Sequence, residues 1–327
     1  MPVNIKTLVA NYPKTIIITD DNVYRIYGHL FEGFEVVVIG NGEASKTLET
    51  VSFVYQRLLE LSADRTTFLL GVGGGVVLDI TGFTASTFMR GLKFGFVPTT
   101  LLAQADAAYG GKNGFNFGGF KNIVGVIKQP EFIHSDFYFL KTLDQEQVNN
   151  GFVEIIKSAL IADKDFFDYL FQNREKLLNF DKEAVNFVIE RAVKIKKEIV
   201  SRDEFETGER RCLNFGHTIG HALESLSDNL INHGNAVAEG IIFSVRASQH
   251  FGYIKVDEMA KIEELFWLYK IGGKLKKYST DQIMECIFSD KKKADDKINF
   301  VFLGGIGKAF VKPISFREVR GLLDDLC

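Results

Sequence analysis

In the first half of the chain, short hydrophobic runs alternate with amphipathic segments. The runs are TIIIT (15–19), EVVVIG (35–40), TTFLLGVG (66–73) and FGFVPTT (94–100). They are rich in β-branched and aromatic residues and are bounded by Gly, Pro or Asp, which is typical of buried strands. Between the second and third runs, residues 46–62 place apolar side chains at helical spacing. Buried strands that alternate with helices predict a parallel, doubly wound sheet, an α/β fold.

From about residue 144 the pattern changes to long helical segments with no strand run between them. These segments are residues 152–178, 183–203 and 208–226. Near the end, KINFVFLGGIGKAFV (297–311) carries glycines at its centre and predicts a β-hairpin. We therefore predict an α/β domain at 1–143 and a mainly α-helical domain at 144–327, with a hinge near KTLDQEQ. Clefts between such domains are common locations of active sites.

Composition narrows the class of protein. The chain has 327 residues, of which 46% are hydrophobic and 25% charged, as in a globular protein with one large or two ordinary domains. The sequence shows no membrane-spanning apolar run and no signal peptide at its start, and a net charge of −3 argues against binding to nucleic acid or a membrane surface. The three cysteines form no CxxC pair. We expect a cytoplasmic protein without a thiolate metal site.

The stretch GERRCLNFGHTIGHALESL (208–226) places four polar residues in a regular pattern. Arg210, Asn214, His217 and His221 follow one another at spacings of four, three and four. If the stretch is one continuous helix, all four side chains project from one side of it. We therefore predict a functional stripe on this helix.

A metal site is one interpretation of the histidines. Two histidines at i and i+4, His217 and His221, can share a metal or a ligand. His233 opens HGNAVAEG, where we expect a loop that leads into a helix, and Glu154 interrupts an otherwise apolar helix and could add a carboxylate. The alternative, that these are ordinary capping or core histidines, stays open at this point.

Two glycine-rich segments indicate anion binding. GVGGGVVLDITGF (71–83) follows a strand and opens a helix, a context in which backbone N–H groups can bind a pyrophosphate, although ordinary βα turns are also glycine-rich. In residues 99–125, Lys112 and Lys121 lie among Gly and Asn, with Asp106 and Asn122 nearby. We expect a binding loop for phosphate or carboxylate rather than a flexible surface loop.

Seven segments, taken in order, resemble the 3-dehydroquinate synthase family of sugar-phosphate cyclases over nearly the whole chain. They are GEASK, GVGGGVVLD, FMRG, VPTTLLAQADAAYGGKNGFN with the later KN, GFVEIIK, RDEFETGERRCLNFGHTIGHALE and HGNAVAEG. The resemblance implies a Rossmann-like NAD-binding domain at 1–143 and a helical domain at 144–327 that binds metal and substrate. It also implies a homodimer, the cofactor NAD, and a divalent metal, Zn²⁺ or Co²⁺.

The resemblance also implies a role for each matching residue. Metal ligands are Glu154, His217 and His233, while His221 contacts the substrate instead. Other substrate residues are Lys157, Lys196, Arg210, Asn214, Asp106, Lys112 and, at the phosphate, Asn122. Arg90 reaches the phosphate site of the neighbouring subunit, and either Lys291 or Lys292 closes the site. Residues for NAD are Asp20, Asn22, Glu43, Lys46, Gly73, Gly74, Gly75, Asp79, Thr99, Thr100, Lys112, Lys121 and Thr142.

The implied reaction belongs to the shikimate pathway of aromatic amino acid biosynthesis. It converts 3-deoxy-D-arabino-heptulosonate 7-phosphate to 3-dehydroquinate and phosphate by oxidation with NAD, phosphate elimination, re-reduction and aldol closure. Asn235 stands where the family usually has an acidic residue near the metal, and residues 144–147 depart from the family's usual TLPxRE. Alternatives are another cyclase that makes a cyclitol or inosose, a metal-dependent alcohol dehydrogenase, and a non-catalytic binding protein.

Overall fold

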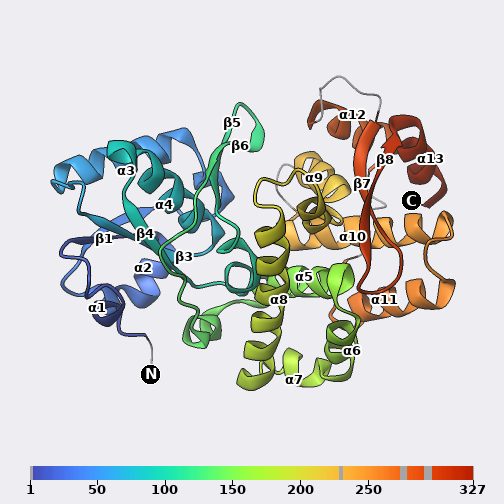
Figure 1. The fold of residues 1–327 in the computed structure, drawn as a ribbon, viewed down its shortest axis with the longest axis horizontal. Coiled ribbons are helices and arrows are strands. Elements are labelled where there is room, and N and C mark those ends of the chain that lie inside the picture. The colour runs from blue at the N-terminus through green and yellow to red at the C-terminus, as the bar shows by residue number, and fades with distance from the viewer. Residues whose placement is uncertain (1–2, 228–230, 273–277, 291–296, 327) are drawn as a thin grey trace. The chain divides into compact units, whose positions relative to one another are not determined.

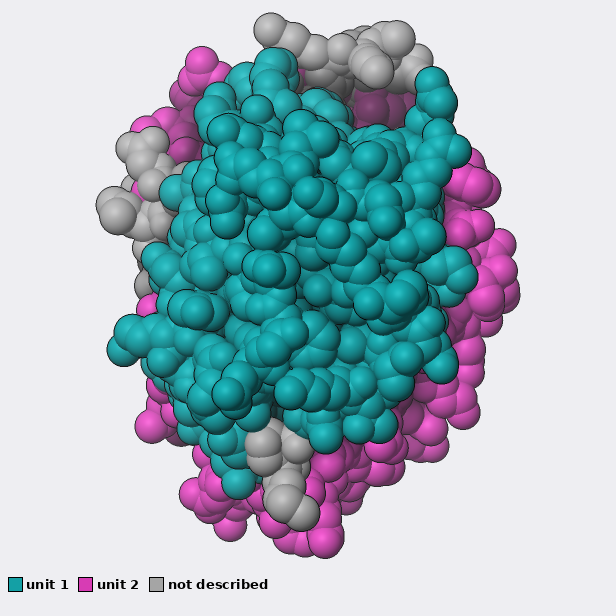
Figure 2. All heavy atoms as spheres, turned by 90° about the vertical axis from the view of Figure 1, so that its left-hand side faces the viewer, with its two compact units in different colours: residues 1–144 teal, residues 145–327 magenta. Residues whose placement is uncertain are grey.

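The chain divides into two compact units, residues 1–144 and 145–327 (Figure 2). The computed structural model describes residues 3–227, 231–272, 278–290 and 297–326. An α/β unit with a parallel sheet comes first and a mainly helical unit second, so the predicted fold class is confirmed (Figure 1). None of the helices in the described part of the chain has the length and apolar character that crossing a bilayer requires.

The sheet of the first unit is parallel and has the order β2-β1-β3-β4. Its strands are β1 (Thr15–Asp20), β2 (Glu35–Ile39), β3 (Phe68–Gly73) and β4 (Lys93–Pro98), one for each predicted run. The chain passes from β1 outward to β2 and then returns to β3 on the other side of β1. The direction of winding therefore reverses between β1 and β3, and the carboxyl ends of both strands meet at one edge of the sheet.

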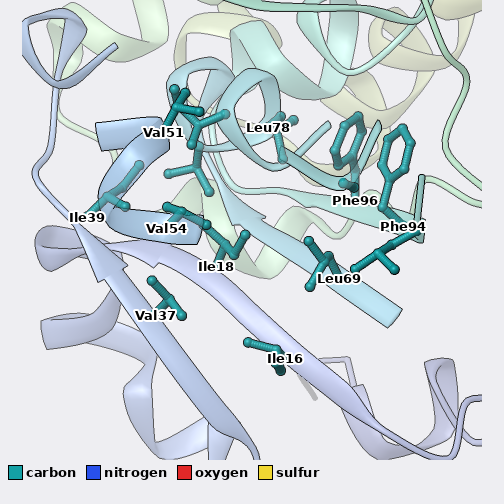
Figure 3. Packing of buried hydrophobic residues seen from close by; sticks show 14 of the residues in the cluster. Ile16, Ile18, Val37, Ile39, Val51, Val54, Leu69, Leu78, Phe94 and Phe96 are labelled. Carbon is teal, nitrogen blue, oxygen red and sulfur yellow. The ribbon is translucent and has the colours of Figure 1, made fainter. Parts of the chain in front are cut away.

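Helices cover both faces of this sheet because neighbouring strand residues point in opposite directions. Ile16 and Ile18 pack with α3 (Leu48–Glu60) and α4 (Gly75–Thr87) on one face (Figure 3). Ile17 faces the other way, toward the short elements of the opposite layer. Those elements are α1 (Ile5–Leu8), α2 (Asp21–Tyr27), η1 (Gly28–Phe31) and η5 (Phe137–Thr142). The doubly wound arrangement predicted from the sequence is confirmed.

The segment expected to be a binding loop is largely an antiparallel hairpin. A π-helical turn, η4 (Ala103–Ala107), precedes β5 (Lys112–Phe117) and β6 (Phe120–Ile127). Phe115 is buried against Phe83 of α4, while Gly114 pairs with Gly125 across the hairpin. The expectation of a loop backbone was wrong, because the paired glycines hide the alternation of buried and exposed positions, while the expected binding of phosphate or carboxylate stays a prediction. The first unit also contains two short 3-10 helices, η2 (Glu43–Ser45) and η3 (Phe88–Arg90).

The second unit combines helices with one hairpin. Its elements are α5 (Gln145–Ala162), α6 (Lys164–Gln172), α7 (Arg174–Leu178), α8 (Lys182–Arg202), η6 (Glu209–Asn214), α9 (His217–Leu226), α10 (His233–His250), α11 (Val256–Leu268), α12 (Thr280–Asp290), β7 (Lys297–Leu303), β8 (Ala309–Ser315) and α13 (Phe316–Leu326). The predicted hairpin is confirmed, since β7 pairs with β8 in antiparallel register. The predicted helical segment 152–178 is three helices, because Asp163 caps a new helix and accepts a hydrogen bond from Phe166 N.

The stretch 208–226 is not one helix. It consists of η6 and α9, with Gly216 between them in the left-handed conformation at φ 81°. A Cβ on Gly216 would lie 2.5 Å from Ile241 Cγ1 and 2.9 Å from Val237 O, so α10 leaves no room for a side chain there. The prediction that four side chains form a stripe on one continuous helix was therefore wrong.

Candidate active site

Three side chains from three helices of the second unit form a group that could hold a metal ion. Glu154 lies in α5, and His217 and His233 are the first residues of α9 and α10. One ligand atom of each lies within 4.8 Å of the others. Glu154 Oε1 is 3.5 Å from His233 Nε2 and 3.9 Å from His217 Nε2. The expected loop position of His233 was wrong, because Asn232 caps α10 one residue earlier by accepting from Asn235 N.

Glu154 has the properties of a metal ligand. It is 2% exposed, so its carboxylate is withdrawn from solvent. Burial opposes its ionisation, but Lys157 Nζ, 2.5 Å from Oε2, and the nearby imidazoles hold the pKa of Glu154 well below its usual value. An ionised carboxylate with two imidazoles fits Zn²⁺ or Co²⁺, and three protein ligands would leave coordination positions open.

The two histidines differ in protonation. Burial and the Lys157 ammonium hold the pKa of His217 well below its usual value, so the ring is neutral. Its Nδ1 lies 3.2 Å from the Phe215 carbonyl oxygen, a contact that leaves Nε2 free to bind a metal. For His233, the carboxylates of Glu154 and Glu224 outweigh burial and raise the pKa to about 10. His233 is therefore protonated in the metal-free protein at neutral pH.

Glu224 is a residue that sequence reasoning missed. It is buried in α9, and its Oε1 lies 3.3 Å from His233 Nδ1. A carboxylate at the second nitrogen of a ligating histidine fixes the ring and raises its basicity. The available signal was an acidic residue in the otherwise apolar HALESL segment, seven positions after His217. Glu224 therefore places a carboxylate beside the candidate metal ligands. This carboxylate is present although Asn235 stands where the resemblance leads us to expect an acidic residue.

His221 is not one of the three residues that could share a metal. Its ring centroid lies 5.3 Å from that of His217 and 6.4 Å from that of His233. The His217–His221 metal pair suggested by spacing is therefore not the group that the fold brings together. Its position beside the group is compatible with the substrate contact that the resemblance implied.

Cationic and amide side chains of the substrate set lie on α5, α8 and η6. Lys157, Lys196 and Arg210 are all buried, at 2%, 8% and 2% exposure. Arg210 Nη1 donates to the Glu204 carbonyl oxygen, and Asn214 Nδ2 donates to Glu206 Oε1. Sequence reasoning missed Glu204 and Glu206, which lie in the loop between α8 and η6.

In the first unit, the residues expected to bind NAD cluster at the carboxyl ends of the strands. Asp20 is the last residue of β1, and its side chain caps α2. Gly73 is the last residue of β3, and the Gly73 carbonyl oxygen accepts a hydrogen bond from Thr99 N at 2.9 Å. A Cβ on Gly73 would lie 2.5 Å from Val77 Cγ2, so only glycine fits this turn. Gly74 is the N-cap residue of α4 and, being a glycine, has no side chain that could accept hydrogen bonds from the first N–H groups of the helix. The edge where winding reverses, next to a free helix N-terminus, fits a dinucleotide pyrophosphate.

A second part of the expected NAD set is joined by polar contacts. The buried Lys46 forms an ion pair with Asp79 of α4 and donates to Asn122 Oδ1 of β6. Asn116 Nδ2 donates to Glu43 Oε1 at 2.7 Å, and Asn122 N donates to Asn116 Oδ1 at 2.8 Å. The fold thus brings Glu43, Lys46, Asp79 and Asn122 together, and Asn116 is a member of this network that the sequence did not indicate.

The remaining predicted residues occupy separate positions. Thr142 Oγ1 hydrogen-bonds to Tyr27 OH at 2.6 Å, and Thr100 Oγ1 accepts from Ala103 N at 3.1 Å. Arg90 is exposed in η3, at φ 69°. The others are Asn22 in α2, Gly75 at the start of α4, Asp106 in η4, Lys112 in β5 and Lys121 in β6. Lys291 and Lys292 lie outside the described residues.

Comparison with known proteins assigns the family. A model of the 3-dehydroquinate synthase N-terminal domain matches residues 36–150, and a model of the C-terminal domain matches residues 151–293. The 3-dehydroquinate synthase of Ruminiclostridium cellulolyticum is 37% identical in an alignment of length 322 that covers 96% of this chain and 90% of that protein. The chain belongs to the 3-dehydroquinate synthase family. The 3-dehydroquinate synthase of Saccharolobus solfataricus is 40% identical over 88% of this chain and 83% of its own.

Solved structures extend the similarity to other members of the fold. The 2-epi-5-epi-valiolone synthase of Streptomyces hygroscopicus subsp. jinggangensis 5008, determined with NAD⁺ and Zn²⁺ bound, has a TM-score of 0.90. It is 28% identical, and the match covers 98% of this chain and 92% of that one. A probable glycerol dehydrogenase from Sinorhizobium meliloti 1021 shares the fold at 14% identity, with a TM-score of 0.70 over 98% of this chain and 92% of that one.

Proposed function

We propose that this protein is a 3-dehydroquinate synthase, which converts 3-deoxy-D-arabino-heptulosonate 7-phosphate to 3-dehydroquinate and phosphate. The observation that carries the proposal is the group of Glu154, His217 and His233 in a chain that also keeps buried Arg210 and Lys196. A catalytic metal site alone would suit many reactions. Buried cations in the same unit favour a polyanionic substrate, and the family's curated relatives carry this activity in their names.

We propose the following division of roles. Arg210 binds the substrate carboxylate, because a planar guanidinium can donate two parallel hydrogen bonds to it. Lys157 and Lys196 supply further positive charge, and Asn214 and His221 orient the substrate hydroxyls. In the first unit, we assign Lys112 and Asn122 to the substrate phosphate, and we assign Asp106 a substrate contact; such contacts hold a substrate in reactive geometry.

Cofactor binding is proposed on the same basis. Gly73, Gly74, Gly75 and the N-terminus of α4 would hold the NAD pyrophosphate, and Glu43 the adenosine ribose. The other NAD residues are Asp20, Asn22, Lys46, Asp79, Thr99, Thr100, Lys112, Lys121 and Thr142. When bound, NAD and a Zn²⁺ or Co²⁺ ion at Glu154, His217 and His233 would supply reversible oxidation and polarise the substrate hydroxyl.

The enzyme class, assembly and location are part of the proposal. Elimination of phosphate makes the protein a carbon–oxygen lyase. We propose a cytoplasmic homodimer in which Arg90 contributes to the phosphate site of the other subunit. We also propose that residues 1–143 form the NAD-binding domain and residues 144–327 the domain for metal and substrate.

A second candidate is another sugar-phosphate cyclase. The similarity to a 2-epi-5-epi-valiolone synthase, with a TM-score of 0.90, favours it. Asn214 and His221 favour the first proposal, because several branches that act on sugars without a carboxylate replace residues at these positions. An alcohol dehydrogenase is less consistent with the chain, since a simple alcohol needs neither Lys112 nor Asn122 at a phosphate.

A cofactor titration separates the cyclase proposals from a dehydrogenase. Purified protein is mixed with substrate and with NAD at one tenth of the substrate concentration. It should release phosphate over many turnovers of each NAD without accumulating NADH. Removal of metal by a chelator should stop phosphate release, and Zn²⁺ or Co²⁺ should restore it. NADH formed in proportion to product would favour the dehydrogenase instead.

A further inference from the structure

The loop between α8 and η6 folds around one carboxylate, that of Asp203. Asp203 Oδ1 accepts hydrogen bonds from Thr207 N at 2.9 Å and Thr207 Oγ1 at 3.2 Å. Its Oδ2 accepts from Gly208 N at 2.8 Å and from Arg210 N at 3.0 Å. Asp203 itself caps the end of α8, since its N–H donates to Ile199 O. One side chain therefore joins the end of a long helix to the beginning of η6.

These hydrogen bonds keep Asp203 ionised. Desolvation opposes ionisation, but the N–H groups of Thr207, Gly208 and Arg210 outweigh it and lower the pKa of Asp203 to about 2. Bonds between an ionised acceptor and N–H donors are about twice as strong as neutral ones. The loop is thus held by charge-assisted bonds.

The same loop holds the two side chains that we assign to the substrate. The carbonyl oxygen of Glu204 accepts from Arg210 Nη1, and Glu206 Oε1 accepts from Asn214 Nδ2. The Glu206 carbonyl oxygen also accepts from Arg211 Nε at 3.3 Å. Glu206 adopts a φ of 59°, a left-handed conformation that disfavours a side chain and must be held by its surroundings.

We infer that Asp203 is a positioning residue for the substrate site: it fixes the loop whose oxygens aim Arg210 and Asn214. The assignment of Arg210 and Asn214 to the substrate rests on the proposed function. The anchoring of the loop rests on the hydrogen bonds alone. An asparagine at position 203 is neutral and has one acceptor oxygen, so it would turn an N–H₂ group toward donors that now face an oxygen.

Loop anchoring can be tested without any substrate. Phe205 is 69% exposed in the loop, so chymotrypsin cleavage after this residue reports loop opening in the folded protein. Asp203→Asn should accelerate this cleavage about tenfold or more, the effect of losing one to two hydrogen bonds to a charged group. The control is Glu183→Gln, which removes an exposed carboxylate from the first turn of α8, far along the chain from the loop, and should leave the cleavage rate unchanged.

Positioning is tested by kinetics on the same variants. Asp203→Asn should raise KM about tenfold with a smaller change in kcat, because a carboxylate contact remote from the reacting carbon binds substrate and transition state alike. In a double-mutant cycle, Asp203→Asn should add little to Arg210→Ala if it acts through Arg210. If Asp203→Asn does not fold, Thr207→Ala removes one donor and should shift cleavage and KM in the same direction by less.

The three measurements separate the anchoring of the loop, the effect through Arg210 and the proposed function. Wild-type cleavage rates in folded Asp203→Asn would overturn the anchoring. Fully additive effects of Asp203→Asn and Arg210→Ala would overturn the route through Arg210. A wild-type protein without cyclase activity but with accelerated cleavage in Asp203→Asn would refute the proposed function and the substrate role of the loop, and would leave the anchoring standing.

Discussion

Protonation at the candidate metal centre is set residue by residue. Glu154 is ionised and His217 is neutral, while Glu154 and Glu224 raise the pKa of His233 to about 10. A metal ion binds the neutral imidazole, so it must displace the proton from His233. Below pH 10 the proton and the metal therefore compete for one nitrogen, and lowering the pH favours the metal-free protein.

This competition predicts proton release on metal binding. At pH 7, Zn²⁺ should release about one proton per site, and the apparent affinity should rise about tenfold per pH unit between pH 7 and pH 9. Calorimetry in buffers of different ionisation enthalpy measures the number of protons released. Release of no proton at pH 7 would contradict the assigned state of His233.

Glu224 should strengthen metal binding without touching the metal. Glu224→Gln keeps the shape of the side chain but removes the charge at His233 Nδ1, and such changes lower metal affinity about 10- to 100-fold. Because Glu224 also stabilises the competing proton, we expect a loss near tenfold. Chelator competition measures it, with Glu183→Gln on α8 as an exposed control. Equal affinity in wild type and Glu224→Gln would show that the contact is unimportant.

The sequence could identify the residue types of this centre but not their geometry. Spacing alone paired His217 with His221, whereas the fold pairs His217 with His233 and Glu154 from two other helices. His233 and Glu154 were candidates from the residues themselves, and only the family resemblance separated His221 from the ligand set. Glu224 was missed because its partner, His233, lies on a different helix, and no pattern within α9 reveals which neighbouring side chain a residue meets.

At the scale of elements, glycines let α9 and α10 approach closely. A Cβ on Gly240 of α10 would lie 1.9 Å from the Gly216 carbonyl oxygen at the start of α9, and a Cβ on Gly220 would lie 3.1 Å from Ala236 O. Backbone atoms cannot turn aside as a flexible side chain can. The close approach matters for the site because His217 and His233 are the first residues of these two helices.

Gly240→Ala should therefore separate the helices. We expect the free energy of unfolding to fall by about 1–3 kcal/mol, the usual cost of overpacking, together with weaker Zn²⁺ binding. The matched control is Gly321→Ala in α13, where an added Cβ has no atom within 4 Å. It should stabilise the protein by about 0.5–1 kcal/mol. Urea unfolding compares the two, and equal stabilities would argue against the close-packing account.

Regular elements could be predicted from the sequence, and local breaks could not. The four strand runs stood out as short apolar runs, three of which, in β1, β3 and β4, are buried on both faces. The hairpin at 112–127 was hidden by the paired Gly114 and Gly125. The break at Gly216 depends on the proximity of α10, a tertiary contact that helical spacing does not encode.

At the scale of the whole molecule, the two units carry complementary chemistry. The first offers the strand ends and the helix N-terminus that suit a dinucleotide, and the second offers the metal-compatible group with its buried cations. Hydrophobic pattern sufficed for the α/β and helical classes. Substrate identity could not come from pattern, because it depends on which anionic groups meet Arg210, Lys196 and Lys157.

The most direct test of the account is phosphate release with three substrates under identical conditions, with NAD and Zn²⁺ present. We predict rapid phosphate release and 3-dehydroquinate from 3-deoxy-D-arabino-heptulosonate 7-phosphate, and little from sedoheptulose 7-phosphate or glucose 6-phosphate, which lack the carboxylate. Arg210→Ala should lower kcat/KM for the first substrate. The lowered value should correspond to a loss of about 2–5 kcal/mol of transition-state stabilisation. Cyclisation of sedoheptulose 7-phosphate with no turnover of the carboxylate substrate would contradict the account.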